Sequence, residues 1–148
     1  MPAQAKPRSP KKPSRHPSGP AEFAPGVFVG GWKDAVAFDG DRFCVLDEPP
    51  EGLPGVTHVP IYDEATDRPL RTNLDRLATL MAQARASGRP VLVFCGHGVR
   101  RSPLAAAWFL HRTAALDLPS AYAQVRRVRP QLETADEWIG DVSSLGAR

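Results

Sequence analysis

Short apolar runs, separated by Gly, Pro and Asp, divide much of this chain into strand-length pieces. Such runs occur at residues 27–30 (VFVG), 42–46 (RFCVL), 56–61 (VTHVPI) and 91–94 (VLVF). The last run has four consecutive apolar residues, which is typical of a strand buried on both faces of a parallel sheet. The turn-forming residues between the runs favour strand ends there. We therefore predict four short strands, the one at residues 91–94 being the most deeply buried.

Apolar residues recur at helical spacing between and after these runs. Leu74, Leu77 and Met81 lie three or four positions apart, which predicts an amphipathic helix that closes at Gly88. Further helices are expected from Ser102 onward, over residues 120–127 and over residues 134–142. A helix that connects two strands serves as a crossover between parallel neighbours. The predicted fold class is therefore α/β, with a small, mainly parallel central sheet flanked by helices.

The first 22 residues differ in composition from the rest of the chain. They are rich in Pro and Ser, carry five Lys or Arg and one acidic residue, and contain almost no large apolar side chains. Such a segment cannot form a core, so residues 1–22 are predicted to be a disordered basic tail and residues 23–148 one catalytic domain. A basic tail can contact nucleic acid or acidic lipid, although a solvated extension is more common.

The lengths of the apolar runs and the number of cysteines indicate the cellular compartment expected for the chain. No apolar run reaches the length of a signal peptide or a membrane span, and Cys44 and Cys95 are the two cysteines of the sequence. Two cysteines are too few for a disulfide framework, so a reducing, cytoplasmic location is expected, with Cys44 filling a strand core. We also expect a monomer.

The chemistry of the chain is predicted to lie directly after the strand at residues 91–94. Cys95 falls at the carboxyl end of that strand, where open α/β sheets bind ligands. Gly96 and Gly98 allow the backbone to curl and point successive N–H groups at one place, next to a helix N-terminus, which creates a site for an anion. Arg101 adds a planar fork that can hold two phosphate oxygens, and these positive surroundings favour the thiolate of Cys95.

This segment resembles the signature of the protein tyrosine and dual-specificity phosphatases. Cys95, Gly98, Arg101 and Ser102 match the family's pattern Cys-x-x-Gly-x-x-Arg-Ser. The resemblance implies a compact phosphatase fold from Val27 onward and hydrolysis of phosphate monoesters through a phosphocysteine, with no metal or cofactor. It assigns the nucleophile, the phosphate-binding arginine and the hydroxyl that stabilises the leaving thiolate to Cys95, Arg101 and Ser102. The phosphate-binding loop would comprise Gly96, His97, Gly98, Val99, Arg100 and Arg101.

Phe94 precedes the signature cysteine and Ser102 follows the signature arginine. Phe94 stands where the family usually has histidine, which helps to hold the loop and the thiolate. Ser102 also has the residue type of a helix N-cap, a role compatible with a hydroxyl at the cysteine.

A general acid is needed as well, because the departing alkoxide or phenoxide must be protonated. Asp63 lies 32 residues before Cys95, a separation similar to that of the acid in dual-specificity phosphatases, and is our predicted donor. Asp67 belongs to the same loop and is the alternative.

The sequence is also compatible with other roles for Cys95 and for the whole domain. Cys95 could be a buried structural cysteine, or Arg100 could supply the shorter spacing typical of rhodanese-like sulfurtransferases. The domain could also be a phospho-binding pseudophosphatase without turnover. His97 and Arg100 could favour multiply phosphorylated ligands, so that phosphoinositides and RNA 5′-phosphates stand beside phosphorylated proteins as candidate substrates. Arg126, Arg127 and Arg129 fall where the resembled phosphatase family often has an Arg-Pro before its last helix, and surface charge is the alternative interpretation.

Overall fold

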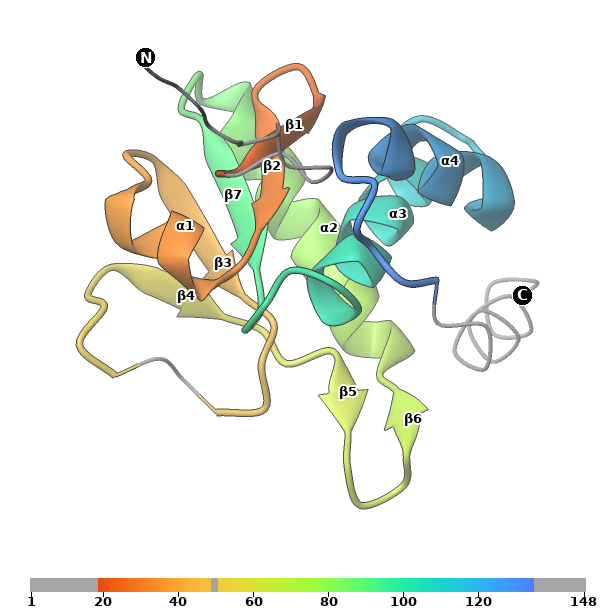
Figure 1. The fold of residues 1–148 in the computed structure, drawn as a ribbon, viewed down its shortest axis with the longest axis horizontal. Helices are drawn as coiled ribbons and strands as arrows, with labels where there is room; N and C mark the ends of the chain where they lie inside the picture. Colours follow the sequence, from red (N-terminus) through yellow and green to blue (C-terminus); the bar gives the residue numbers. More distant parts are fainter. Residues whose placement is uncertain (1–18, 49–50, 135–148) are drawn as a thin grey trace, which may run out of the picture.

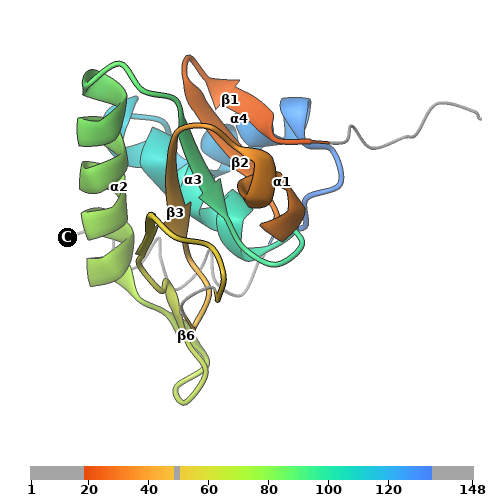
Figure 2. The ribbon, with the colours of Figure 1, turned by 90° about the vertical axis from the view of Figure 1, so that its left-hand side faces the viewer.

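A computed structural model of the chain describes residues 19–48 and 51–134. They form a five-stranded sheet with helices on both faces (Figures 1 and 2). The strand order is β1-β2-β7-β3-β4, and a two-stranded β5–β6 hairpin lies beside it. The strands are β1 (Ala21–Ala24), β2 (Val27–Gly30), β3 (Asp41–Cys44), β4 (Val56–His58), β5 (Tyr62–Asp63), β6 (Arg68–Pro69) and β7 (Val91–Phe94). The helices are α1 (Trp32–Ala37), α2 (Arg71–Ala86), α3 (Arg101–Thr113) and α4 (Leu118–Val128).

Strand β7 occupies the middle of the sheet. It pairs in parallel with β2 on one side, where Val27 is opposite Val91, and with β3 on the other, where Asp41 is opposite Val91. All four residues of β7 are fully buried, as the uninterrupted apolar run predicted. Because β2, β3 and β7 all run in the same direction, their carboxyl ends meet at one edge of the sheet, where the segment 95–101 begins.

Two apolar clusters hold the layers together. The larger lies between the sheet and helices α2, α3 and α4, and Trp108 is its largest fully buried side chain. The Trp108 indole N–H donates to Asp75 on α2 at 2.8 Å, which satisfies the polar atom that this side chain carries into the core. The smaller cluster lies on the opposite face, under α1, and includes Cys44, Leu92 and Phe94. Both clusters pack against β7, so the strand that carries Cys95 is fixed from both faces.

The predicted strands and helices that fall on described residues agree with the structure in their order and type. Helix α2 ends at Ala86, and Gly88 then adopts a positive φ of 91°, which explains why glycine closes it. The predicted helix over residues 120–127 corresponds to α4, whose N-cap is Asp117. The predicted helix over residues 134–142 lies, apart from Thr134, outside the described residues.

Two expectations need correction. The boundary of the disordered tail at residue 22 falls inside β1, because Ala21 and Glu22 pair with Val29 and Phe28 of β2. This strand buries a single large side chain, Phe23, so its sequence carries little strand signal. The β5–β6 hairpin stands where a loop was expected, because two-residue strands leave no periodic pattern. The other tail residues, up to residue 18, lie outside the described part of the chain.

The described residues contain no helix with the length and apolarity needed to cross a membrane.

Candidate active site

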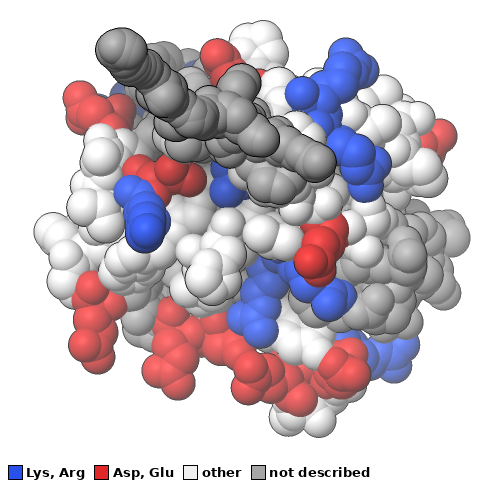
Figure 3. All heavy atoms as spheres, viewed as in Figure 1, with Lys and Arg blue, Asp and Glu red and all other residues white. Residues whose placement is uncertain are grey.

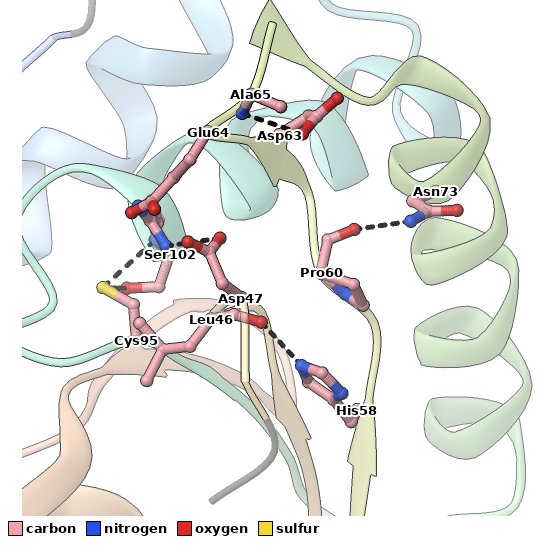
Figure 4. A network of polar contacts seen from close by, with 11 residues as sticks. Leu46, Asp47, His58, Pro60, Asp63, Glu64, Ala65, Asn73, Cys95 and Ser102 are labelled. Carbon is pink, nitrogen blue, oxygen red and sulfur yellow. Dashed lines mark hydrogen bonds and ion pairs between the residues drawn. The ribbon is translucent and has the colours of Figure 1, made fainter. Parts of the chain in front are cut away.

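The sulfur of Cys95 lies at the centre of a tightly curled loop at the end of β7 (Figure 4). The backbone N–H groups of Gly98 and Ser102 point at Cys95 Sγ, at 3.2 and 3.4 Å. The thiol also donates to Ser102 Oγ at 3.3 Å. Donors that converge on sulfur stabilise its anionic form and can equally surround the oxygens of a bound anion.

Ser102 is held from two directions. Its Oγ, which is fully buried, donates to the carbonyl oxygen of Gly30 at 3.0 Å while accepting from the Cys95 thiol. The residue is the second of helix α3, whose N-cap is Arg100, so the interpretation of Ser102 as a helix cap is wrong. The reason is that the helix begins two residues earlier than the Ser-Pro pair indicates, and the Ser102 hydroxyl bonds the cysteine instead.

The two glycines of the loop serve different purposes. Gly98 has a φ of +71°, and a Cβ there would lie 2.5 Å from Arg129 Nη2 and 2.7 Å from the Gly30 carbonyl carbon. Glycine is therefore required at residue 98 both for its conformation and for space. Gly96 has neither restriction, since a Cβ would meet no heavy atom within 4 Å. At Gly31, by contrast, a Cβ would come within 2.9 Å of the Gly96 carbonyl oxygen, so this turn also needs glycine to pack against the loop.

Arg101 is the first residue of α3, and its guanidinium is held by two carboxylates and an aromatic ring. Nη1 bonds Asp47 Oδ1 at 3.0 Å, Nη2 lies 3.7 Å from Glu64 Oε2, and the guanidinium carbon is 5.1 Å from the centre of the Tyr62 ring. Asp47 is the closer partner, and its side chain is 30% exposed against 74% for Glu64. Arg101 therefore has one firm partner and one that solvent or a ligand can replace.

The segments that carry these carboxylates are anchored to the fold. A ring nitrogen of His58 on β4 lies 2.6 Å from the carbonyl oxygen of Leu46, next to Asp47. Asn73 at the start of α2 donates to the carbonyl oxygen of Pro60 at 2.7 Å, just before β5. Figure 4 shows both anchors on the side of the site opposite the loop.

Asp63, the predicted acid, is the last residue of β5 and points away from Cys95 in Figure 4. One carboxylate oxygen accepts from the Ala65 N–H at 3.1 Å and the other from the Thr66 hydroxyl at 3.0 Å, so both bonds stay within its own turn. Glu64, the next residue, extends toward the cysteine instead. Asp67, the alternative acid, is exposed in the same turn with a φ of 57°.

Phe94 and Cys44 lie on the α1 side of the sheet. The Phe94 ring packs edge-on against Trp32 with 6.2 Å between ring centres, so the position usually held by histidine is here part of an apolar contact. Cys44 is the neighbour of Phe94 on β3 and is fully buried, as predicted for a core residue. Burial raises the pKa of the Cys44 thiol, with a further contribution from nearby Cys95, which keeps this thiol protonated at neutral pH.

A hollow of about 430 Å³ opens above the sulfur. It is lined by Leu46, Cys95, Gly96, His97, Val99, Arg100, Arg101 and Glu133. Six of the seven predicted residues from Cys95 to Arg101 therefore border this hollow. The exception is Gly98, which is buried. Figure 3 shows acidic side chains along the lower edge of this face, on the side of the β5–β6 hairpin. The hairpin contributes the carboxylates of Asp63, Glu64 and Asp67, and the loop contributes Arg100 and Arg101.

Sequence reasoning missed Asp47, Glu64 and Arg129. Asp47 follows the apolar run of β3 just as Cys95 follows that of β7, and the shared strand direction was the signal that could have found it. Arg129 is 6% exposed, so its interpretation as surface charge is wrong: it packs behind the loop. No local sequence pattern indicates a role for Glu64, since its contact with Arg101 depends on how the β5–β6 hairpin is placed.

Comparisons with known proteins agree with this geometry. Residues 52–146 match the family described as "Dual specificity phosphatase, catalytic domain". The chain is 32% identical to mouse dual specificity protein phosphatase 12 over 134 residues, covering 79% of this chain and 39% of that protein. It is 30% identical to human dual specificity phosphatase 28, covering 74% of this chain and 68% of the relative.

Solved structures show the same relationship. The crystal structure of human DUSP28 superimposes with a TM-score of 0.72 at 25% identity, covering 89% of this chain and 97% of that one. A mouse dual specificity phosphatase complexed with zinc tungstate gives a TM-score of 0.71 at 27% identity, covering 94% and 96%. The chain spans only about two fifths of the length of mouse dual specificity protein phosphatase 12. The family match and the shared fold show that this chain belongs to the dual-specificity phosphatase family.

Proposed function

We propose that this protein hydrolyses phosphate monoesters of phosphorylated proteins, on tyrosine or on serine and threonine, through a phosphocysteine intermediate. The observation that carries the proposal is the convergence of two backbone N–H groups on Cys95 Sγ inside a hollow that Arg101 also lines. A sulfur so placed is both activated as a nucleophile and surrounded by donors for a tetrahedral anion. The mouse relative complexed with zinc tungstate supports the choice of such an anion.

In the first step the Cys95 thiolate attacks phosphorus in line with the leaving oxygen. The S–P bond forms as the P–O bond to the substrate breaks, and a proton from the general acid neutralises the departing oxygen. The inward N–H groups and Arg101 stabilise the charge on the three remaining oxygens. Arg101 can turn toward phosphate by exchanging its long contact with exposed Glu64, while Asp47 keeps hold of Nη1.

In the second step water attacks the phosphocysteine, and the carboxylate formed in the first step takes its proton. The P–S bond breaks and its electron pair returns to sulfur as thiolate. Ser102 Oγ, 3.3 Å from that sulfur, donates to Gly30 in the resting state. Rotation of its hydroxyl hydrogen from the carbonyl to the sulfur provides a third donor to the departing thiolate, without any movement of heavy atoms.

The proposed general acid is Asp63. Its two hydrogen bonds are local and lie in an exposed turn, so the carboxylate can exchange them at modest cost, about 0.5–1.5 kcal/mol each. Reaching the leaving group requires the turn at residues 64–67 to reorient. Glu64 is the second candidate, because its carboxylate already lies beside Arg101 without such a change.

We further propose that the enzyme acts in the cytoplasm as a monomer. Both cysteines are free thiols, and a catalytic thiol must remain reduced to act. Among the described residues, Val36 is the single large hydrophobic residue whose side chain is exposed. This leaves little apolar surface for contact with a second subunit.

Hydrolysis of p-nitrophenyl phosphate in EDTA between pH 5 and 8 tests the reaction. Wild-type turnover that disappears in Cys95→Ser is the expected result. Tungstate binding without turnover would instead indicate a phospho-binding module, and Phe94 would be the first residue to replace, by histidine.

Leaving groups identify the acid. General acids contribute about 10²- to 10⁴-fold, and mainly when the leaving group is poor. Asp63→Asn should therefore slow alkyl phosphates far more than p-nitrophenyl phosphate, whereas Glu64→Gln should affect both substrates to the same small extent. The opposite pattern would transfer the role to Glu64.

A further inference from the structure

Arg129 lies at the C-terminal end of α4, directly behind the loop that follows Cys95. Among the residues that the structure describes, its guanidinium makes three hydrogen bonds, all to backbone carbonyl oxygens. Nε donates to Gly98 at 2.8 Å, Nη2 to His97 at 3.2 Å and Nη1 to Gly19 at 3.3 Å. A buried, permanently charged side chain that binds only main-chain acceptors is unusual, since buried charges are normally paired with carboxylates.

The loop needs these donors because four of its consecutive carbonyl groups turn outward. The Gly96 oxygen accepts from the Trp32 N–H at 2.9 Å, and the Val99 oxygen from the Glu133 N–H at 2.7 Å. The two oxygens between them, those of His97 and Gly98, are the ones that Arg129 binds. Backbone groups thus hold the ends of this run, and one side chain holds its middle.

An outward carbonyl dictates an inward N–H. In a trans peptide unit the C=O and the following N–H point in opposite directions, so fixing the His97 and Gly98 oxygens also fixes the N–H groups of Gly98 and Val99. The Gly98 N–H is one of the donors to Cys95 Sγ. If either peptide flipped, a carbonyl oxygen would face the anion site, and it would repel both the thiolate and a phosphate.

We propose that Arg129 is a positioning residue that keeps the middle of the phosphate-binding loop in its anion-binding orientation. The inference rests on the proposed function, because that function requires the N–H groups of the loop to bind phosphate. The planar guanidinium is suited to the task, since its fork reaches two successive carbonyls at once, whereas a lysine ammonium is a single point of charge. Its positive charge also lies within the same network that surrounds the sulfur.

The surroundings of Arg129 permit a direct test. A second hollow of about 410 Å³ lies behind the loop and is lined by Lys33, Asp34, Gly96, His97 and Arg129 among others. A small cation can therefore enter from solvent when the arginine side chain is removed. Arg127, two positions earlier in the chain and exposed, provides a matched control that loses the same charge without touching the loop.

The experiment compares the wild type with Arg129→Ala, Arg129→Lys and Arg127→Ala, measuring tungstate affinity by calorimetry, kcat with p-nitrophenyl phosphate and melting temperature. Arg129→Ala should weaken tungstate binding by about 10- to 100-fold, since each tenfold corresponds to one charge-assisted hydrogen bond. Guanidinium chloride, far below denaturing concentrations, should restore part of that affinity. Arg129→Lys should remain well below wild type, and Arg127→Ala should match it.

A lower melting temperature in Arg129→Ala with wild-type tungstate affinity and kcat would overturn the positioning role and leave Arg129 as a structural residue. If Arg129→Ala fails to fold, Arg129→Lys tests the positioning role. Wild-type tungstate affinity in Arg129→Lys would show that the loop does not need the forked guanidinium. The two proposals fail separately. If the wild-type protein binds tungstate but shows no turnover, only the phosphatase proposal is contradicted. If turnover and tungstate affinity do not change when Arg129 is substituted, only the positioning role is contradicted.

Discussion

Substituting Gly98 by alanine should destabilise the protein far more than the same change at Gly96, two residues away in the same loop. Gly98 adopts a φ of +71°, and its missing Cβ would lie 2.7 Å from the Gly30 carbonyl carbon and 2.5 Å from Arg129 Nη2. A left-handed conformation costs a residue with a Cβ about 1–2 kcal/mol. Overpacking a closed site adds about 1–3 kcal/mol, and here one contact is backbone that cannot rotate away.

The sum, about 2–5 kcal/mol, is a large part of the 5–15 kcal/mol that typically separates folded from unfolded domains. Neither the conformational cost nor the overpacking cost applies to Gly96→Ala, since the φ of Gly96 is not in the left-handed region and a Cβ there would enter open space. Reduced entropy of the unfolded chain should leave its effect within about 1 kcal/mol of zero.

Urea unfolding of the three proteins, followed by circular dichroism, gives the free energies directly. Stability is the primary readout, because a methyl group at residue 96 borders the hollow above the sulfur and could hinder a substrate without any strain. In Gly98→Ala we also expect kcat to fall, since the Gly98 N–H would move away from Cys95 Sγ. Equal unfolding free energies for the two variants would refute the reasoning from φ and contact distance.

Two further predictions concern the carboxylates and the second cysteine. Asp47→Ala should raise KM for p-nitrophenyl phosphate several-fold by freeing Arg101, whereas Glu64→Gln should leave KM unchanged or lower it; a larger rise for Glu64→Gln would reverse the two assignments. Because burial raises the pKa of Cys44 above its ordinary value of 9.0, the folded state holds that proton more tightly than the unfolded state. Stability should therefore decline as pH rises above about 9, with a shallower decline in Cys44→Ala, and urea midpoints across pH 8 to 10.5 check this. Parallel declines in the two proteins would remove Cys44 as the cause.

The sequence carried the parts of the site that are contiguous in the chain. The run at residues 91–94 predicted a strand buried on both faces, and the order Cys95, Gly98, Arg101, Ser102 predicted a loop that feeds a helix. These features are local, because strand burial depends on an uninterrupted apolar run and loop curvature on glycine. Family membership followed from the same residues. The sequence could not distinguish the two glycines, since the need at residue 98 arises from Gly30 and Arg129, which are distant in the chain.

The tertiary structure alone decided what surrounds that loop. Asp47 reaches Arg101 because β3 lies beside β7, and Arg129 reaches the loop because α4 packs against α3 and ends behind it. Asp63 and Glu64 are adjacent in sequence, yet Asp63 ends β5 and bonds within its own turn, whereas Glu64, the first residue of that turn, reaches Arg101. A sequence pattern records which residues can perform the chemistry. Their partners come from segments 31 to 72 positions away, and only the packing of helices and strands determines which of them meet.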